Sequence, residues 1–377
     1  MTEKPRVVHL IIGLGKGGAE TMLYQVIKHR TEEAPDYYVI SLGLSHYYEE
    51  LLGQMGVEVL ELDLRKHPFG CIRRIRKELR SSDVLCCWMY ISNLIGYIAG
   101  RKKVSKLIWC IRHSDLTKEN NSSKTLIINR ICKSLSPKID LVTYNGKRAR
   151  EVHYDYGYRP VKDVILNNGL DISEYYSDET LRRKLREELG IETDKKVILS
   201  VSKDHPIKDI PTFIKAFADL KSKRNDVIAV MCGLGLSEDN DRIRQLCVEN
   251  GLEVGKDIIL LGFKENVNEI LNSGDVYVLH SAGEAFPNTL IQAMACEIPV
   301  VSTDVGDVVE IMGGREYIVS VGDSSAISAK INSILDMSDA AKAEMVTRNR
   351  KIVEEKYDIR NIVRSYESCY EEKIDNG

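Results

Sequence analysis

Residues 281–296 hold the side chains best suited to binding a polar ligand. An apolar run at residues 275–280 predicts a buried strand before them, and helical spacing begins at Thr289. Glu284 is therefore predicted in a loop at the carboxyl edge of a parallel sheet, beside the amides of a helix N-terminus. A carboxylate there accepts hydrogen bonds from ligand hydroxyls, while the amides bind an anionic or carbonyl group. A sugar attached to a phosphate presents both groups.

Two lysines follow another apolar run, at residues 196–201. Lys203 and Lys208 lie five residues apart on one predicted loop, and two ammonium groups at that spacing suit a diphosphate. The alternative is an exposed loop with ordinary lysines. Two turns, at residues 233–235 and 262–266, end the next two predicted strands at the edge where a nucleotide would lie. Both turns could also be simple connections.

A glycine-rich turn, Gly15-Lys-Gly-Gly18, opens a predicted helix after the first strand. Backbone amides without a Cβ can approach a phosphate there, although a tight strand-to-helix connection has the same composition.

The elements that position these residues form two series. Short apolar runs alternate with helical or polar segments, the pattern of βα units in a parallel sheet. The runs of the first series lie at residues 6–12, 37–42, 57–60, 84–88, 107–111, 141–144 and 164–166, and those of the second at 196–201, 227–232, 258–261, 276–279, 299–302 and 317–321. A charged segment at residues 177–195 separates them. Two doubly wound α/β sheets facing across a cleft are the simplest architecture.

The final segment reads as a long helical stretch. It extends from Ser338, a plausible N-cap, to about Lys373, with a break near residues 357–358. We expect its last part to return to the first domain. The predicted domains are residues 1–170 with about 359–377, and residues 171–358.

Length and charge limit the function classes. The 377 residues fit two domains. Residues 1–172 hold 27 Lys and Arg against 19 Asp and Glu, a balance of +8, which leaves 26 against 37, or −11, for the remainder. Basic clusters at residues 65–66, 73–80 and 101–103 suit anionic lipid headgroups or phosphorylated substrates. The alternative is that they are solvated helix faces.

Three features concern location and metals. The longest apolar window, residues 84–99, is shorter than the roughly 20 residues that span a bilayer, so we expect a strand followed by a buried helix. Nine cysteines without a Cys-x-x-Cys pair are typical of small buried hydrophobes in a reducing compartment. No metal-ligand spacing appears, so no metal site is predicted, and no signal peptide is evident. We expect a cytoplasmic protein.

The order of these features resembles the GT-B glycosyltransferases of family 4, the large retaining group of group 1 glycosyl transferases. The resemblance rests on Gly17-Gly-Ala-Glu20, Asn168-Gly-Leu-Asp171, Glu284-Ala-Phe-Pro-Asn288 and Thr303-Asp-Val-Gly306, and it covers essentially the whole chain. It implies an acceptor-binding first domain and a nucleotide-sugar-binding second domain, both Rossmann-like. It also implies no cofactor besides the nucleotide sugar as co-substrate.

The resemblance also implies roles for individual residues. Lys203 and Lys208 would neutralise the donor's diphosphate as it leaves, and Glu284 would hold hydroxyls of the donor sugar, with the amides of residues 286–289 close by. His113 matches the family's histidine near the reaction centre, although by itself it would more often be structural. The implied donor-binding residues, with the first two facing the diphosphate, are Gly17, Gly18, Gly233, Gly235, Phe263, Lys264, Asn266, Phe286, Pro287, Asn288, Thr289 and Gln292.

Three positions depart from the family pattern. Lys203 stands where arginine is usual and supplies a point charge without the bidentate fork. Gln292 replaces the second glutamate of the Glu-x7-Glu motif, so its hydrogen bond to the ribose loses charge assistance, a change on the order of 1 kcal/mol. Gln292 could instead form a capping box with Thr289. Ala285 replaces a common glycine, a mild change.

The implied activity is transfer of a hexosyl or N-acetylhexosaminyl group from a nucleotide diphosphate sugar, with UDP favoured, to an acceptor hydroxyl. Relatives suggest a lipid-linked saccharide acceptor in surface polysaccharide or lipopolysaccharide assembly. The basic first domain would then contact the anionic inner face of the cytoplasmic membrane, and no nucleic-acid partner is expected. The alternative is a catalytically weak or inactive protein that keeps the fold and the nucleotide. A phosphorylase would need a lysine for pyridoxal phosphate and a much longer chain.

Overall fold

The protein divides into two compact units. The computed structural model describes residues 6–118 and 120–372. Unit 1 comprises Met1–Gly169 and Ile359–Gly377, and unit 2 comprises Leu170–Asp358. The chain leaves and re-enters unit 1 at adjacent points, because Leu170 forms a parallel bridge with Asp358 and its amide donates to the Tyr357 carbonyl at 2.7 Å.

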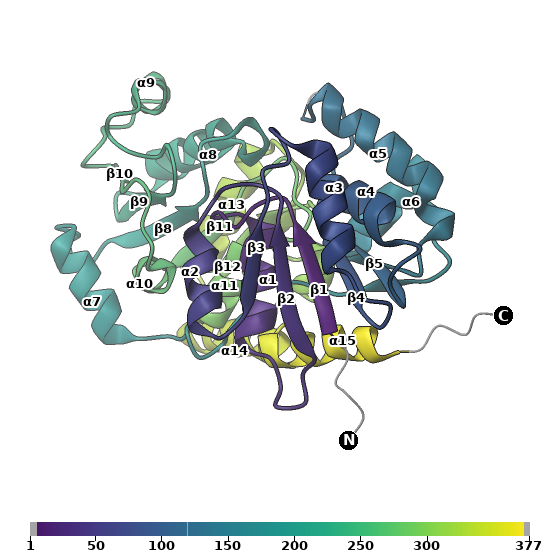
Figure 1. Cartoon of the computed structure of the whole chain (residues 1–377). Helices are drawn as coiled ribbons and strands as arrows, with labels where there is room; N and C mark the ends of the chain where they lie inside the picture. The colour runs from purple at the N-terminus through teal and green to yellow at the C-terminus, as the bar shows by residue number, and fades with distance from the viewer. Residues whose placement is uncertain (1–5, 119, 373–377) are drawn as a thin grey trace. The chain divides into compact units, whose positions relative to one another are not determined.

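Unit 1 contains a seven-stranded parallel sheet in the order β3-β2-β1-β4-β5-β6-β7. Figure 1 shows β3, β2, β1 and β4 as neighbouring arrows. Helices on both faces bury the strands, which is why each reads as a near-continuous apolar run. The strands are β1 (Arg6–Ile11), β2 (Asp36–Ser41), β3 (Glu58–Glu61), β4 (Val84–Trp88), β5 (Lys106–Ile111), β6 (Leu141–Tyr144) and β7 (Asp163–Ile165).

A helix from the far end of the chain completes the core of unit 1. Figure 1 shows α15 (Ile359–Glu371) in yellow, the colour of the end of the chain. Its residues Val363, Tyr366 and Tyr370 pack with the buried side chains of β1, β4 and α1. The Tyr366 ring stacks on Trp88 with centroids 6.0 Å apart. The other helices of unit 1 are α1 (Gly18–Lys28), α2 (Tyr47–Gln54), α3 (Pro68–Glu78), α4 (Met89–Gly100), α5 (Ser123–Leu135), α6 (Lys147–Tyr156) and the 3-10 turn η1 (Ser136–Lys138).

Unit 2 repeats the design with a six-stranded sheet in the order β10-β9-β8-β11-β12-β13, again parallel throughout. Its strands are β8 (Lys196–Val201), β9 (Val227–Cys232), β10 (Ile258–Leu260), β11 (Val276–Leu279), β12 (Val300–Thr303) and β13 (Ile318–Val319). Its helices are α7 (Glu179–Glu188), α8 (Ile210–Lys223), α9 (Asp241–Glu249), α10 (Val267–Asn272), α11 (Asn288–Ala295), α12 (Val308–Ile311), α13 (Ser324–Leu335), α14 (Asp339–Lys356) and the 3-10 turn η2 (Pro206–Lys208).

The charged segment between the two series is part of unit 2. Its helix α7 attaches to the sheet through Arg182 and Arg186, which contact the Asp275 carboxylate at 2.7 and 2.6 Å. Burial opposes ionisation of Asp275, yet the two guanidinium groups hold its pKa below the ordinary value. The high charge of this segment therefore contributes to packing.

The predicted elements agree with the structure to within one or two residues at each strand end. Residues 84–99 form β4 and the partly buried α4, and the final stretch breaks at Tyr357 and Asp358 between α14 and α15. Ser338 caps α14 by accepting from the Ala341 amide, whereas the predicted end near Lys373 lies outside the described residues. Eight of the nine cysteines are buried, and all nine are unpaired. Within the described ranges, no helix is long and apolar enough to cross a bilayer.

Candidate functional site

The candidate site of unit 2 lies where the strand order reverses. β8 and β11 are adjacent and parallel. The chain continues from β8 to β9 on one side of this pair, and from β11 to β12 on the other side. Loops from the carboxyl ends of such strands diverge and leave a crevice in which ligands bind. The loop after β8 carries Lys203 and Lys208, and the loop after β11 carries Glu284. Topology therefore explains why residues 76 positions apart, Lys208 and Glu284, meet.

Glu284 is the centre of a polar cluster. Its Oε1 accepts hydrogen bonds from Lys208 Nζ at 2.5 Å and from Ser281 Oγ at 2.7 Å. The side chains of Lys208 and Glu284 are only 21% and 11% exposed. Solvent screens a pair at this depth less than an ordinary surface ion pair. The cluster thus holds a carboxylate ready to accept from ligand hydroxyls, beside a cation that can meet an attached anion.

Backbone contacts fix the loop that presents Glu284. The Ala282 amide donates to the Ile207 carbonyl at 2.8 Å, which ties this loop to η2, and Thr303 Oγ1 donates to the Ser281 carbonyl at 2.7 Å. Gly306 has φ +54°, and a Cβ there would lie 2.8 Å from the Glu284 carbonyl oxygen. Only glycine suits that position, so Gly306 of the Thr303-to-Gly306 motif supports the Glu284 loop.

The two lysines predicted to act together differ in environment. Lys208 lies in η2 and is paired with Glu284. Lys203 is exposed, and among the described residues it has no hydrogen-bond or ion-pair partner. Its ammonium group can therefore move to a ligand without breaking an existing contact, whereas that of Lys208 is shared with the carboxylate.

The glycine turns after β9 and β10 pack tightly beside the Lys203 loop. Gly233 has φ +144°, and a Cβ there would lie 1.5 Å from the Ser202 carbonyl oxygen. Its amide donates to the Gly262 carbonyl at 2.8 Å, and the Asp204 amide donates to the Leu234 carbonyl at 2.8 Å. Gly235, with φ +80°, continues the same turn. These contacts hold the three loops after β8, β9 and β10 together at the carboxyl edge of the sheet.

Residues 263–266 include two exposed side chains and one helix cap. The Phe263 side chain is 55% exposed, and Lys264 is exposed beside it. Asn266 is the N-cap of α10, where its side chain accepts from the Glu269 amide at 3.2 Å. Helix capping therefore explains Asn266 within the protein, while the side chains of Phe263 and Lys264 are exposed to solvent.

Gln292 does not form the capping box that its spacing with Thr289 suggested. Both residues lie inside α11, whose N-cap is Pro287, and Thr289 Oγ1 instead accepts from the Tyr277 hydroxyl at 2.6 Å. Gln292 Nε2 donates to the Tyr175 hydroxyl at 2.9 Å. Its Oε1 is buried and has no hydrogen-bond partner among the described residues. That oxygen is an acceptor for which the described residues supply no donor.

The start of α11 only partly matches the expectation of four amides at residues 286–289. Pro287 has no N–H, so the amides come from Phe286, Asn288 and Thr289. The Phe286 side chain is buried and packs edge-to-face on Tyr357, with centroids 5.5 Å apart. Among the described residues no side chain caps this helix. A ligand group could therefore satisfy its first amides.

Gly17, Gly18 and His113 belong to unit 1. Gly17 is the N-cap of α1, and its amide donates to the Gly15 carbonyl at 3.0 Å. A Cβ on Gly18 would have nothing within 4 Å, so packing alone does not require glycine there. His113 is half-buried, with its Nε2 3.1 Å from Asn121 Oδ1 and its ring edge-on to Tyr90.

A pocket of unit 1 was not predicted from the sequence. It has a volume of about 1020 Å³. It is lined by the Gly13-to-Gly17 turn with Lys16, by Arg65 and Lys66, and by an apolar wall from α4 and α5. That wall is formed by Ile91, Leu94, Ile95 and Ile128. The apolar residues of the two helices are visible in the sequence, but only the tertiary packing shows that they line a pocket with the glycine turn.

Comparisons with known proteins agree with this arrangement. The family described as "Glycosyl transferases group 1" matches residues 182–352, and "Glycosyltransferase Family 4" matches residues 16–174. N-acetyl-alpha-D-glucosaminyl L-malate synthase of Bacillus anthracis is 29% identical over 215 residues, covering 56% of this chain and about half, 54%, of that protein.

Two further similarities extend over most of the chain. The N-acetylgalactosamine-N,N'-diacetylbacillosaminyl-diphospho-undecaprenol 4-alpha-N-acetylgalactosaminyltransferase of Campylobacter jejuni is 26% identical over 351 residues, covering 88% of this chain and 91% of that protein. The crystal structure of Anabaena HepE in complex with UDP and glucose superimposes with a TM-score of 0.82 at 21% identity, covering 97% and 99% of the two chains.

Proposed function

This chain belongs to the GT-B glycosyltransferases of family 4, and from that premise we propose that it transfers a hexosyl or N-acetylhexosaminyl group from a UDP-sugar, with retention at the anomeric carbon. The observation that carries the proposal is the cluster of Glu284, Lys208 and Ser281 at the switch point of unit 2. Glu284 accepts hydrogen bonds from the donor sugar's hydroxyls. The diphosphate attached to that sugar then lies within reach of Lys208.

Catalysis in this proposal is mainly electrostatic. As the bond between the anomeric carbon and the diphosphate oxygen breaks, negative charge grows on the diphosphate and positive charge on the sugar. Lys203, Lys208 and the first amides of α11 stabilise the leaving diphosphate, as preorganised donors do at other oxyanions. A diphosphate oxygen accepts the proton of the acceptor hydroxyl while that hydroxyl's oxygen bonds to the anomeric carbon on the same face. We propose no cofactor beyond the nucleotide sugar, and no metal ion at the diphosphate.

One observation supports UDP as the nucleotide: the structurally similar HepE was crystallised with UDP. Among the described residues Gln292 Oε1 is a buried acceptor without a donor, which suits the ribose hydroxyl of any nucleotide. The test is ligand-induced thermal shift against UDP-, GDP- and ADP-sugars, since selective binding raises the melting temperature by mass action. We expect a UDP-sugar to give the largest shift, and equal or absent shifts would contradict the nucleotide assignment.

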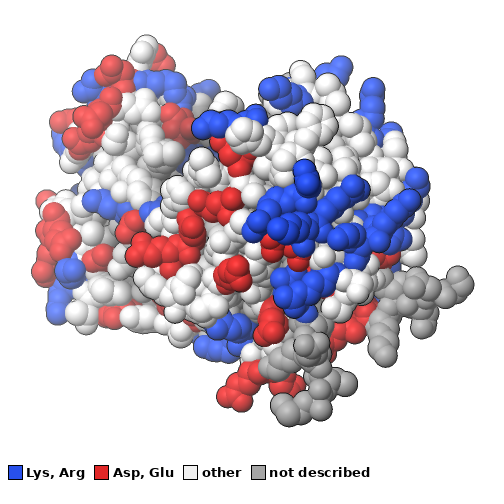
Figure 2. Space-filling model, viewed as in Figure 1, with Lys and Arg blue, Asp and Glu red and all other residues white. Residues whose placement is uncertain are grey.

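For the acceptor we propose a lipid-linked saccharide of bacterial surface polysaccharide or lipopolysaccharide assembly. The Campylobacter relative is named for a diphospho-undecaprenol acceptor. The unit 1 pocket combines cations with an apolar wall, and Figure 2 shows Lys and Arg side chains gathered over α3. Exposed members of this basic face are Arg73, Arg74, Arg76 and Lys77.

The membrane part of this proposal has its own test. We expect co-flotation with vesicles containing anionic phospholipid, weakening as salt rises, and little co-flotation with vesicles of neutral phospholipid. Equal flotation with both vesicle types, or none, would contradict membrane contact while leaving the donor assignment intact.

Lys203 and Gln292 favour one alternative, a binding protein with little turnover. Both replace the groups usual in this family, and the Gln292 amide is already bonded to Tyr175. Release of free UDP from the responding UDP-sugar, by transfer or slow hydrolysis, supports the enzyme. Tight donor binding without any UDP release supports the binding protein.

A further inference from the structure

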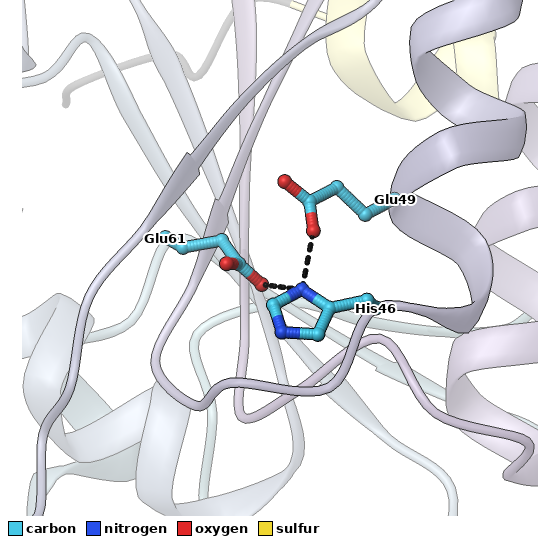
Figure 3. A group of neighbouring side chains, drawn as sticks. All are labelled: His46, Glu49 and Glu61. Carbon is cyan, nitrogen blue, oxygen red and sulfur yellow. Dashed lines mark hydrogen bonds and ion pairs between the residues drawn. The ribbon is translucent and has the colours of Figure 1, made fainter.

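A histidine and two glutamates of unit 1 converge at a place that the proposed sugar transfer does not use. His46 immediately precedes α2, Glu49 lies in the first turn of α2, and Glu61 is the last residue of β3. Figure 3 shows both carboxylates directed at the same ring nitrogen of His46. No metal site was predicted here, because Glu61 comes from another element, β3, and lies 12 residues beyond Glu49 in the sequence.

The geometry leaves one carboxylate oxygen without a hydrogen bond. His46 Nδ1 lies 2.7 Å from Glu49 Oε2 and 3.2 Å from Glu61 Oε1. A single N–H can point at only one of them. Glu61 Oε1 is shielded from solvent and receives no hydrogen bond within the described part of the chain.

We propose that His46, Glu49 and Glu61 bind a divalent transition-metal ion, with Zn²⁺ the favoured ion. The three donor atoms all lie within 4.8 Å of one another. Ligands about 2.0–2.1 Å from Zn²⁺ in tetrahedral geometry are roughly 3.3 Å apart, so small side-chain rotations suffice. Neutral imidazole with two carboxylates balances a charge of +2. An imidazole ligand favours Zn²⁺ over Mg²⁺ or Ca²⁺, which prefer oxygen.

The surroundings can complete the coordination. A cavity of about 450 Å³ adjoins the cluster and is lined by His46, Glu49, Glu50, Gly53, Val57 and Val59. Its size admits water as the fourth ligand. Glu61 sits in the paired strand β3, opposite Ser41 of β2, and Glu49 is held in a helix. A bound ion would therefore fasten the start of α2 to the end of β3.

The test is metal titration of the full chain after chelator treatment and removal of the chelator. We expect the wild type to take up one equivalent of Zn²⁺ by calorimetry, and Co²⁺ to give the visible absorption of a low-symmetry site. Glu61→Gln and His46→Gln each keep the side-chain size and should weaken binding at least tenfold. Glu50→Gln is the matched control, because Glu50 lines the same cavity on the same helix without contacting the cluster.

Either of two results would overturn the proposal. One is the absence of stoichiometric uptake by the wild type, which would make the cluster an ion pair between an imidazolium and two carboxylates. The other is equal uptake by wild type, Glu61→Gln and His46→Gln. Circular dichroism and UDP-sugar binding confirm that each variant is folded. Because the cluster contains none of the residues proposed to bind the donor, loss of the metal site should leave donor binding unchanged, so the two proposals can fail separately.

Discussion

At the scale of single residues, the contact between Lys208 and Glu284 sets the chemistry. We predict that Lys208→Ala lowers kcat about 100-fold, because one preorganised charge at the leaving group is typically worth 10²–10³ in rate. Lys215→Ala is the matched control, since Lys215 is an exposed lysine on the following helix α8. The measurement is steady-state kinetics with the responding UDP-sugar. An equal effect of both substitutions would show that Lys208 has no specific role in catalysis.

A substitution at Gln292 should strengthen ligand binding instead of weakening activity. We predict that Gln292→Glu tightens UDP binding about fivefold, because a charge-assisted hydrogen bond to the ribose gains about 1 kcal/mol over a neutral one. The Tyr175 hydroxyl can donate to the new carboxylate in place of the contact it accepts now at 2.9 Å. Calorimetric titration with UDP measures the change, and weaker binding by the variant would place the ribose elsewhere.

Sequence reasoning identified single residues well where local order carries the information. Glu284 and Lys208 follow predicted strands, and the structure brings them together. The capping box, which was the alternative interpretation of Gln292, does not form, because Thr289 and Gln292 bond to Tyr277 and Tyr175 instead. Sequence reasoning also did not foresee Asn266 as a helix cap or Glu61 beside His46. The local spacing of residues in the sequence does not show a hydrogen-bond or ion-pair partner that lies on another element.

At the scale of elements, the glycine turn after β9 should be intolerant of any side chain. We predict that Gly233→Ala destabilises unit 2 by at least about 3 kcal/mol, from overpacking and backbone strain, because its Cβ would lie 1.5 Å from the Ser202 carbonyl oxygen. Gly251→Ala is the control, with φ +73° but open space around it, and should cost only about 1 kcal/mol of backbone strain. Urea unfolding measures both, and equal losses would show that the turn can adjust.

The strands were predictable from the sequence because parallel strands buried on both faces form continuous apolar runs. The unit 1 pocket was not, because its apolar wall combines α4 and α5 while its cations come from the turns after β1 and β3. Periodicity places an apolar residue on a helix face. It does not say whether that face meets the core or an open pocket, as Ile91 and Ile128 illustrate.

At the scale of the whole molecule, buried histidines should make the protein sensitive to acid. Burial lowers the pKa of His9 to about 3, and of His153 and His280 to about 4. The unfolded chain, with an ordinary histidine pKa near 6.5, therefore binds protons first. The contribution of these histidines to the free energy of unfolding therefore has its full value above pH 6.5 and decreases as the pH falls toward 4.

Unit 2 offers a direct check of this dependence. Its His280 should contribute on the order of 3 kcal/mol to the loss between pH 6.5 and 4. His280→Gln, whose longer amide can still bond to Ser200 Oγ, now 2.7 Å from His280 Nε2, should flatten the pH dependence of urea unfolding over this interval. An unchanged slope would mean that His280 titrates alike in the folded and unfolded states.

The return of α15 to unit 1 determines the order in which the protein can fold during synthesis. Val363, Tyr366 and Tyr370 fill the core behind β1 and β4, yet the ribosome makes them only after every residue of unit 2. Unit 2 is continuous in sequence and can close as soon as it emerges. The first strands to leave the ribosome are therefore among the last to be buried, and the apolar surface of β1 and β4 that α15 covers stays exposed until α15 has been made.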